Sequence, residues 1–443
     1  MSRTETPAAT LPVAIIGSGP VGLAAAAELV ERGLPFVLFE KANEPSAAVA
    51  AWGHVQLFSP WAFNTAPAAE RLLVETGWVR PPDADYPTGS DLRHLYLLPL
   101  ARHPAIASRL RLGTEVTAIA RAGTDRVRTA GRLDRPFVVR TRGAAGEAEL
   151  LTSAVIDASG TWDTPNRSRS GGLGALGETG DDVARRISYA MPDVLGRARH
   201  RFAGRRVAVL GSGHSALGTL LDLDRLASEE PGTQVTWLIR SRLSDLRLDD
   251  GGKDRLAARG ALATSVAGLL STGRVTVRGD SRVDTLSAEG GALVIRLDDG
   301  TALAVDEFVV ATGFRPDHAL AAELRLSLDP VVDCPTQLAP LIDPNMHSCG
   351  TVRPHGHAVL AHPDAGYVIV GMKSYGRAPT FLMATGYEQV RSVVAHLAGD
   401  TVAAADVRLV LPETGVCSTD RLPSPAAGCC GGARSTRVPE MQD

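Results

Sequence analysis

Short apolar runs alternate with helix-like segments at the start of the chain. Residues 11–16 (LPVAII) predict a buried strand, residues 23–33 predict a helix that ends at Gly33, and the apolar run before Glu40 predicts a second strand. A glycine-rich segment, GSGPVG, lies between the first strand and the helix. This order predicts a βαβ unit with a tight glycine turn.

The same pattern returns about 195 residues later. Residues 205–210 predict a strand, the segment GSGHSALG follows it, residues 219–227 are largely apolar, and residues 235–240 predict the next strand. A duplicated βαβ unit indicates two separate nucleotide-binding domains, and this repeat is the most informative feature of the sequence.

The remaining segments carry weaker patterns. Residues 47–104 are rich in proline and tryptophan, which predicts irregular structure packed over a ligand rather than sheet. Residues 378–399 predict a long amphipathic helix, and the Ser-, Pro- and Gly-rich composition after about residue 414 predicts a tail with little regular structure. Further strands are expected at residues 115–120, 137–140, 154–156, 293–297, 307–310 and 367–370.

Composition narrows the class of protein. The chain has 443 residues, 44% of them apolar, and a formal net charge of −3, which argues against a nucleic-acid-binding or polybasic membrane-surface protein. No run approaches the 18 or so apolar residues of a membrane span. The first ten residues lack the apolar core of a signal peptide. We therefore expect a cytoplasmic protein of two or more domains.

The first glycine motif has the spacing of a dinucleotide site. Its first glycine permits the tight turn, the second lets the backbone approach a pyrophosphate, and the third lets the helix pack against the strand. Glu40 ends the next strand, where a carboxylate accepts ribose hydroxyls and repels a 2′-phosphate, so FAD or NAD is favoured over NADP. The alternative is a chance glycine-rich turn. The expected contacts are Gly17, Gly19, Pro20, Gly22, Glu40 and Lys41.

The second motif carries a different specificity signal. The strand that follows this motif, residues 235–240, ends in Arg240. An arginine at this place can pair with a 2′-phosphate, which favours NADPH over NADH. The alternative is that Arg240 is a solvated charge at a strand end. The other expected contacts in this motif are Gly211, Gly213, His214 and Ser215.

Two glycine motifs, the first followed by a glutamate and the second by an arginine, resemble those of the two-dinucleotide-binding-domain flavoproteins. The segments DASGTWDTPN (157–166) and VVATGFRP (309–316) are similar to the paired ATG-type motifs at which that superfamily crosses between domains. The resemblance implies an α/β fold with two Rossmann-like domains. An NADPH domain at residues 166–305 is inserted into an FAD domain at residues 1–165 and 306–400, and a tail follows at residues 401–443. The resemblance also adds Ala158, Ser159, Gly160 and Gly313 to the expected cofactor contacts.

Within this superfamily, GSGHSA followed by WLIR resembles the flavin-containing monooxygenases, which use NADPH, FAD and O2 to oxygenate a small soft nucleophile. The stretches AWGHVQLFSPW (51–61) and GMKSYGRAPTFLMATGYEQV (371–390) are similar to flavoproteins encoded with bacterial arsenic-resistance genes, which implies a substrate such as a trivalent arsenical. Residues 187–206 match the monooxygenase fingerprint FxGxxxHxxx(Y/W) poorly, so other activities stay open. No CxxC is present, which argues against a thioredoxin-reductase-like enzyme.

The resemblance also places residues at the flavin ring. Trp52 and His54 would lie across the isoalloxazine, although the alternatives are a core tryptophan and a loop histidine. Val116 would lay its backbone against the adenine. The final helix would begin near Pro379 and Thr380 and point at the pyrimidine end of the ring. Lys373 would stabilise reduced flavin as a catalytic cation, or it is a surface charge.

Three of the five cysteines, Cys417, Cys429 and Cys430, lie within the last 27 residues. Vicinal thiolates can capture a soft metalloid such as As(III), although a functionless tail is the alternative. Two further hypotheses follow: a dithiol or metalloid reductase that uses Cys429 and Cys430 catalytically, and a thiol-rich metalloid-binding flavoprotein. Cys349 lies near several histidines with no compact zinc spacing, so we expect a polar pocket lining there.

Overall fold

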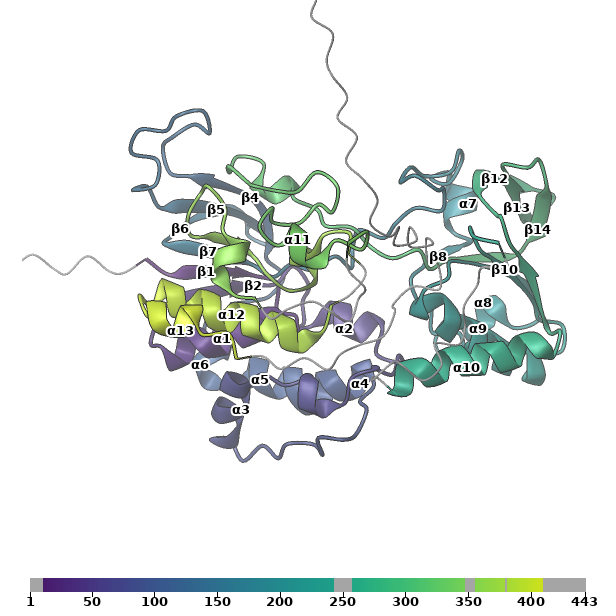
Figure 1. Ribbon diagram of the computed structural model, residues 1–443, viewed down its shortest axis with the longest axis horizontal. Coiled ribbons are helices and arrows are strands. Elements are labelled where there is room, and N and C mark those ends of the chain that lie inside the picture. The colour runs from purple at the N-terminus through teal and green to yellow at the C-terminus, as the bar shows by residue number, and fades with distance from the viewer. Residues whose placement is uncertain (1–10, 243–256, 347–354, 379–380, 409–443) are drawn as a thin grey trace, which may run out of the picture.

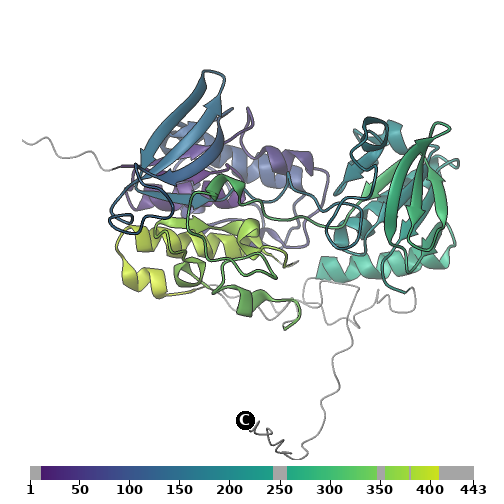
Figure 2. The same cartoon turned by 90° about the horizontal axis from the view of Figure 1, so that it is seen from above.

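The computed structural model describes residues 11–242, 257–346, 355–378 and 381–408. Figure 1 shows two α/β bodies side by side, and Figure 2 shows them from above with the chain crossing between them. Within the described ranges, no helix is long and apolar enough to cross a membrane. The predicted fold class, α/β with two dinucleotide-binding bodies, is confirmed.

The first body is built on a five-stranded parallel sheet in the order β16-β7-β1-β2-β3. One face of this sheet packs against α1 (Pro20–Glu31), α3 (Pro67–Val74) and α12 (Met383–Leu397) in a large apolar core. Its strands are β1 (Val13–Ile16), β2 (Phe36–Phe39), β3 (Leu110–Arg111), β7 (Ala154–Asp157) and β16 (Tyr367–Ile369).

A second sheet, which is antiparallel, covers the other face of the parallel sheet in the first body (Figure 1). It consists of β4 (Glu115–Arg121), β5 (Phe137–Gly143) and β6 (Gly146–Thr152). Successive side chains of a strand point to opposite faces, so Val13 and Ile15 face the helices while Ala14 and Ile16 face this second sheet. Burial on both faces explains why these strands read as unbroken apolar runs.

The second body repeats the plan of the first. Its parallel sheet, in the order β11-β10-β9-β15-β8, packs against helices on one face and an antiparallel sheet on the other. The parallel strands are β8 (Ile187–Tyr189), β9 (Arg206–Leu210), β10 (Gln234–Leu238), β11 (Val275–Arg278) and β15 (Glu307–Val310). The other elements are α7 (Asp181–Ala184), α8 (Arg199–Phe202), α9 (His214–Glu229), α10 (Ala257–Ser271), β12 (Val283–Glu289), β13 (Ala292–Leu297) and β14 (Ala302–Val305).

Strand β15 belongs to the second parallel sheet, where it pairs with β8 and β9. The chain therefore leaves the second body after residue 310, beyond the expected boundary at residue 305. The structure forms a strand at each predicted position, but β3, β6, β8, β11, β12 and β14 were not predicted. Strand β6, for example, is largely exposed and has no long apolar run.

Residues 47–104 differ from the expected irregular structure. They fold mainly into short helices, because prolines such as Pro67 and Pro104 occupy first-turn positions, where a missing N–H costs nothing. The other short helices that begin in this region are α2 (Ala47–Ala51), η1 (Trp61–Phe63), α4 (Gly89–Leu92), η2 (Arg93–Leu97), α5 (Leu98–Arg102) and α6 (Pro104–Ala107).

The final long helix, α12, begins at Met383 rather than near residue 379. Phe381 and Leu382 precede it in extended structure, and Pro379 and Thr380 lie outside the described residues. Short elements surround this region: η4 (Ala319–Ala321), α11 (Ala339–Ile342), η5 (His357–Leu360), η6 (Gly371–Tyr375) and α13 (Thr401–Ala405).

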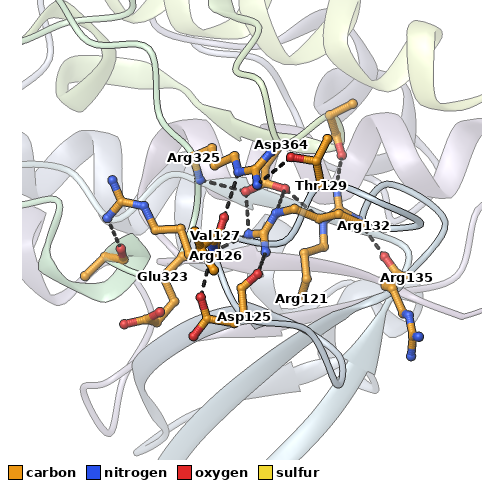
Figure 3. A network of polar contacts seen from close by, with 12 residues as sticks. Arg121, Asp125, Arg126, Val127, Thr129, Arg132, Arg135, Glu323, Arg325 and Asp364 are labelled. Carbon is orange, nitrogen blue, oxygen red and sulfur yellow. Dashed lines mark hydrogen bonds and ion pairs between the residues drawn. The ribbon is translucent and has the colours of Figure 1, made fainter.

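A buried carboxylate ties a long loop to the first body (Figure 3). Asp364, which is fully buried, accepts hydrogen bonds from Arg121 of β4 (3.2 Å), from Arg132 of the loop between β4 and β5 (2.8 and 2.9 Å) and from the backbone N–H of Arg325 (2.6 Å). The two arginine side chains are themselves almost wholly buried. One carboxylate thus connects three distant segments of the chain.

Candidate active site

The first glycine motif forms a tight turn between β1 and α1. Gly17 has a φ of +93°, which favours glycine, and a Cβ on Gly22 would lie 1.9 Å from the carbonyl oxygen of Gly17. Gly19 precedes α1, and a Cβ there would meet nothing within 4 Å. Pro20 is the first residue of the helix. Gly17 therefore forms the turn, Gly19 leaves open space for a ligand, and Gly22 lets the helix pack against the turn, as the motif predicts.

Glu40 follows β2 and is held by its neighbours. Its Oε2 accepts hydrogen bonds from the backbone N–H (2.9 Å) and the hydroxyl (2.7 Å) of Ser18, and its Oε1 accepts one from the N–H of Ala42 (3.0 Å). Sequence reasoning did not single out Ser18, although it lies inside the glycine motif. Its hydroxyl fixes the carboxylate at the end of β2, beside the glycine turn.

A cavity of about 1020 Å³ opens at the carboxyl ends of the first sheet and extends to the second body. This is large for a ligand pocket and leaves room for a dinucleotide. The predicted site residues that line it are Gly17, Gly19, Pro20, Glu40, Lys41, Trp52, Val116, Ala158, Ser159, Gly160, Ser215 and Lys373.

Strand order orients a dinucleotide in this cavity. The glycine turn follows β1, with β2 on one side and β7 and β16 on the other. Glu40 at the end of β2 and Val116 in β4 therefore mark the adenosine half. The other half faces Ser159 after β7 and residues 370–373 after β16, which also line the cavity. The residues present thus fit FAD: a helix N-terminus for its pyrophosphate, a carboxylate for a ribose and a partly apolar far end.

Lys373 lies in η6 on this far side, and its side chain is 1% exposed. Its Nζ contacts Oδ2 of Asp157 at 2.7 Å and Oγ of Ser159 at 3.1 Å. The surface-charge alternative for Lys373 is therefore wrong. Burial by itself raises the pKa of the Asp157 carboxyl, but Lys373 and hydrogen bonds from Ser159 and Tyr367 reverse the shift and lower that pKa.

The two ATG-type segments run side by side between the bodies. The N–H of Asn166 donates to the carbonyl of Gly313 (2.9 Å), and the N–H of Arg315 donates to that of Thr164 (2.9 Å). Trp162 and Phe314 stack with ring centroids 5.3 Å apart, and both line the cavity. Lys41 and Asp163 form an ion pair (2.5 Å) at the same wall.

The second glycine motif repeats the geometry of the first. Gly211 has a φ of +129°, and its Cβ would lie 2.3 Å from the carbonyl oxygen of Ala311. Gly213 precedes α9, and a Cβ there would meet nothing within 4 Å. His214 begins α9 with its ring 5.1 Å from that of Phe58, and Arg240 lies exposed just beyond β10. The helix N-terminus again offers free N–H groups to an anion.

His54 lies apart from the residues that line the cavity. Burial lowers the pKa of its imidazole, and hydrogen bonds with the backbone of Met191 and Pro192 only partly offset this. Asp193 and Arg197 of the second body are close enough to influence that pKa. The structure therefore places His54 between the two bodies rather than in the cavity wall with Trp52.

Other candidate groups do not form a metal site in the described part of the chain. His355 contacts Gln389 (3.0 Å), His357 stacks on His396 at 4.4 Å, and His362 accepts from the N–H of Ser327 (3.2 Å). No group of three potential metal ligands gathers among the described residues. Cys349, Cys417, Cys429 and Cys430 lie outside them.

Comparisons with known proteins agree with this architecture. The family described as pyridine nucleotide-disulphide oxidoreductase matches residues 14–348. No curated protein sequence matches the chain. A bacillithiol disulfide reductase from Bacillus cereus superposes with a TM-score of 0.62 at 18% identity, over 88% of this chain and 99% of that one.

Two solved monooxygenases share the fold. An ornithine hydroxylase from Pseudomonas aeruginosa has a TM-score of 0.59 at 16% identity, over 88% of this chain and 99% of that one. A flavin-containing monooxygenase from Stenotrophomonas maltophilia has a TM-score of 0.53 at 19% identity, over 88% of this chain and 98% of that one. The chain belongs to the pyridine nucleotide-disulphide oxidoreductase family and is an oxidoreductase with two dinucleotide-binding bodies.

Proposed function

We propose that the chain is an FAD-containing, NADPH-dependent oxidoreductase of the flavin monooxygenase type. The observation that carries this proposal is that both glycine motifs meet at one cavity: Gly17 and Gly19 line it from the first body and Ser215 from the second. Hydride transfer needs the two cofactors in contact, and a shared cavity allows this. The cofactor prediction agrees with two solved enzymes of this fold, a cadaverine monooxygenase bound to FAD and an ornithine N-hydroxylase with reduced FAD and NADP⁺.

The chain's own residues bind and orient the cofactors. The N-terminus of α1 faces the FAD pyrophosphate, Glu40 accepts from a ribose, and Arg240 pairs with the 2′-phosphate of NADPH. FAD, when bound, supplies the chemistry of hydride acceptance and O2 activation. The overall reaction consumes NADPH, a proton and O2, inserts one oxygen atom into a soft nucleophile such as a trivalent arsenical, and releases NADP⁺ and water.

Anaerobic mixing with nicotinamide nucleotides tests this proposal. We expect NADPH to bleach the flavin band rapidly and NADH to bleach it slowly, as measured by stopped-flow absorbance. In Arg240→Glu the apparent Kd for NADPH rises at least tenfold, since a charge-assisted hydrogen bond contributes roughly 1.5–3 kcal/mol and about 1.4 kcal/mol corresponds to tenfold. Arg225→Glu, on the exposed face of α9, is the matched control and leaves both rates unchanged. If neither nucleotide bleaches the flavin, the proposal fails.

A second candidate function is a dithiol or metalloid reductase, which the likeness to the bacillithiol disulfide reductase favours. Against it, the described residues that line the cavity include no cysteine. Cys334, the cysteine that the structure describes, is buried, and burial raises the pKa of its thiol to about 12, so it is a poor nucleophile. A reductase would therefore depend on Cys429 and Cys430.

Replacing Cys429 and Cys430 by serine separates the candidates. The monooxygenase proposal predicts that NADPH-dependent O2 consumption in the double variant stays within about twofold of the wild-type rate. An oxygen electrode measures this directly. A loss of NADPH turnover with a disulfide or metalloid acceptor, while NADPH still bleaches the flavin, would instead establish the reductase. A loss of arsenite affinity alone would establish the metalloid-binding flavoprotein.

A further inference from the structure

A buried ion pair lies on the cavity wall at the end opposite Glu40. Lys373 and Asp157 are 1% and 0% exposed, and their charged atoms are 2.7 Å apart. Asp157 ends β7 and Lys373 follows β16, two strands that are neighbours in the sheet. The pair therefore joins two adjacent strand ends at the place where ligands bind in sheets of this kind.

Asp157 has a full set of partners besides Lys373. Its Oδ1 accepts from the N–H (3.1 Å) and hydroxyl (2.6 Å) of Ser159, and its Oδ2 accepts from the hydroxyl of Tyr367 (2.8 Å). These three hydrogen bonds favour the ionised carboxylate even without the lysine. Lys373, in contrast, contacts Asp157 and Ser159 and also lines the cavity together with Gly371 and Met372. Lys373 is thus the member of the pair that lines the cavity, and Asp157 is not among the described residues that line it.

We infer that Lys373 is the fixed cation that favours reduced FAD in this enzyme, and that Asp157 is the positioning residue that holds its ammonium against the cavity. The inference rests on the proposed binding of FAD, with the adenosine half marked by Glu40 and Val116. Reduction adds negative charge to the flavin, and a buried cation stabilises it because charges interact strongly where water is excluded. The paired lysine still acts on the ring, because Lys373, and not Asp157, is among the described residues that line the cavity.

Three variants give the inference a signature that a structural role does not produce. In Lys373→Met the cavity keeps the Asp157 charge alone, and we expect the equilibrium between oxidised and reduced flavin to move at least tenfold toward oxidised, about 30 mV lower for a two-electron couple. The double variant Asp157→Asn/Lys373→Met also lacks the ammonium but no longer carries the lone carboxylate, so we expect a smaller shift in the same direction. Lys373→Arg keeps the potential within about threefold of the wild-type equilibrium, roughly 15 mV.

The reduction potential is measured by equilibrating the FAD-loaded proteins with a reference dye and a chemical reductant. This measurement needs no NADPH, so a failure of the nucleotide prediction does not affect it. Arg140→Met is the control, because Arg140 forms an exposed ion pair with Glu149 and is not among the described residues that line the cavity. We expect it to change the flavin equilibrium less than twofold.

Two results would overturn the inference. An unchanged potential in Lys373→Met shows that the ammonium does not act on the flavin. A double variant with the wild-type potential shows that the shift in Lys373→Met comes from the uncompensated Asp157 carboxylate and not from the lost ammonium. A protein that binds no FAD at all instead contradicts the proposed function, so the two failures are distinguishable.

Discussion

Replacing Gly22 by alanine is expected to yield protein that binds FAD at least 100-fold more weakly than the wild type, about 2.7 kcal/mol. The added Cβ would lie 1.9 Å from the carbonyl oxygen of Gly17, a distance at which the backbone of the turn must move. That turn places the N-terminus of α1 against the cavity, so its displacement removes the groups that face the pyrophosphate. The ratio of flavin to protein absorbance, followed by titration of the apoprotein with FAD, measures the effect.

Two other glycines serve as comparisons for this substitution. At Gly19 an added Cβ meets no protein atom, so Gly19→Ala leaves the turn intact and weakens FAD binding only by occupying space on the cavity wall. At Gly268, in α10, a Cβ also meets nothing, and alanine there leaves FAD binding unchanged. If Gly22→Ala retained wild-type FAD affinity, the assignment of this turn as the pyrophosphate site would be wrong.

Local patterns were sufficient to predict most of the nucleotide-binding framework. The glycine turn, the following helix and the acid at the end of β2 are all determined by neighbouring residues, because a βαβ unit is formed by local contacts. The same applies to the second motif, where Gly211 has the positive φ that its place in the motif requires. The two ATG-type segments likewise pair with each other, as Asn166 and Gly313 show.

Long-range contacts explain what the sequence could not predict. Lys373 looked like a surface charge because its partner, Asp157, lies 216 residues away. The position of β15 in the second sheet depends on pairing with β9, about 100 residues earlier, and not on its own apolar run. In residues 47–104 the proline and tryptophan content predicts irregular structure rather than sheet, although Pro67 and Pro104 begin helices. His54 was placed at the flavin by resemblance, and the charged residues that act on its imidazole, Asp193 and Arg197, come from the second body.

Replacing Asp364 by asparagine is expected to lower the free energy of unfolding by about 3–5 kcal/mol, the usual cost of breaking a buried ion pair on one side. The substitution leaves Arg121 and Arg132, 3% and 2% exposed, without a carboxylate. The loop between β4 and β5 then loses the carboxylate that joins Arg132 to the backbone of Arg325 (Figure 3). It keeps the hydrogen bonds from the Arg325 side chain to Arg126 and Thr129 and those between the loop and residues 322–323. Urea denaturation followed by circular dichroism at pH 7 measures the change. Glu149→Gln, which removes the carboxylate of the exposed Arg140–Glu149 pair, is the matched control and changes stability little.

The pH dependence of this difference provides a second test. Burial by itself raises the pKa of the Asp364 carboxyl, but hydrogen bonds from Arg132 and from the backbone of Arg325 reverse this, so its pKa in the folded protein is lowered. A group with a lowered pKa contributes stability above its unfolded pKa, about 3.9 for aspartate, and loses it as the pH falls through the folded value. The stability difference between wild type and Asp364→Asn therefore shrinks as the pH is lowered from 7 toward 3. A difference that stays constant over this range would show that the asparagine acts through altered packing and not through the lost charge.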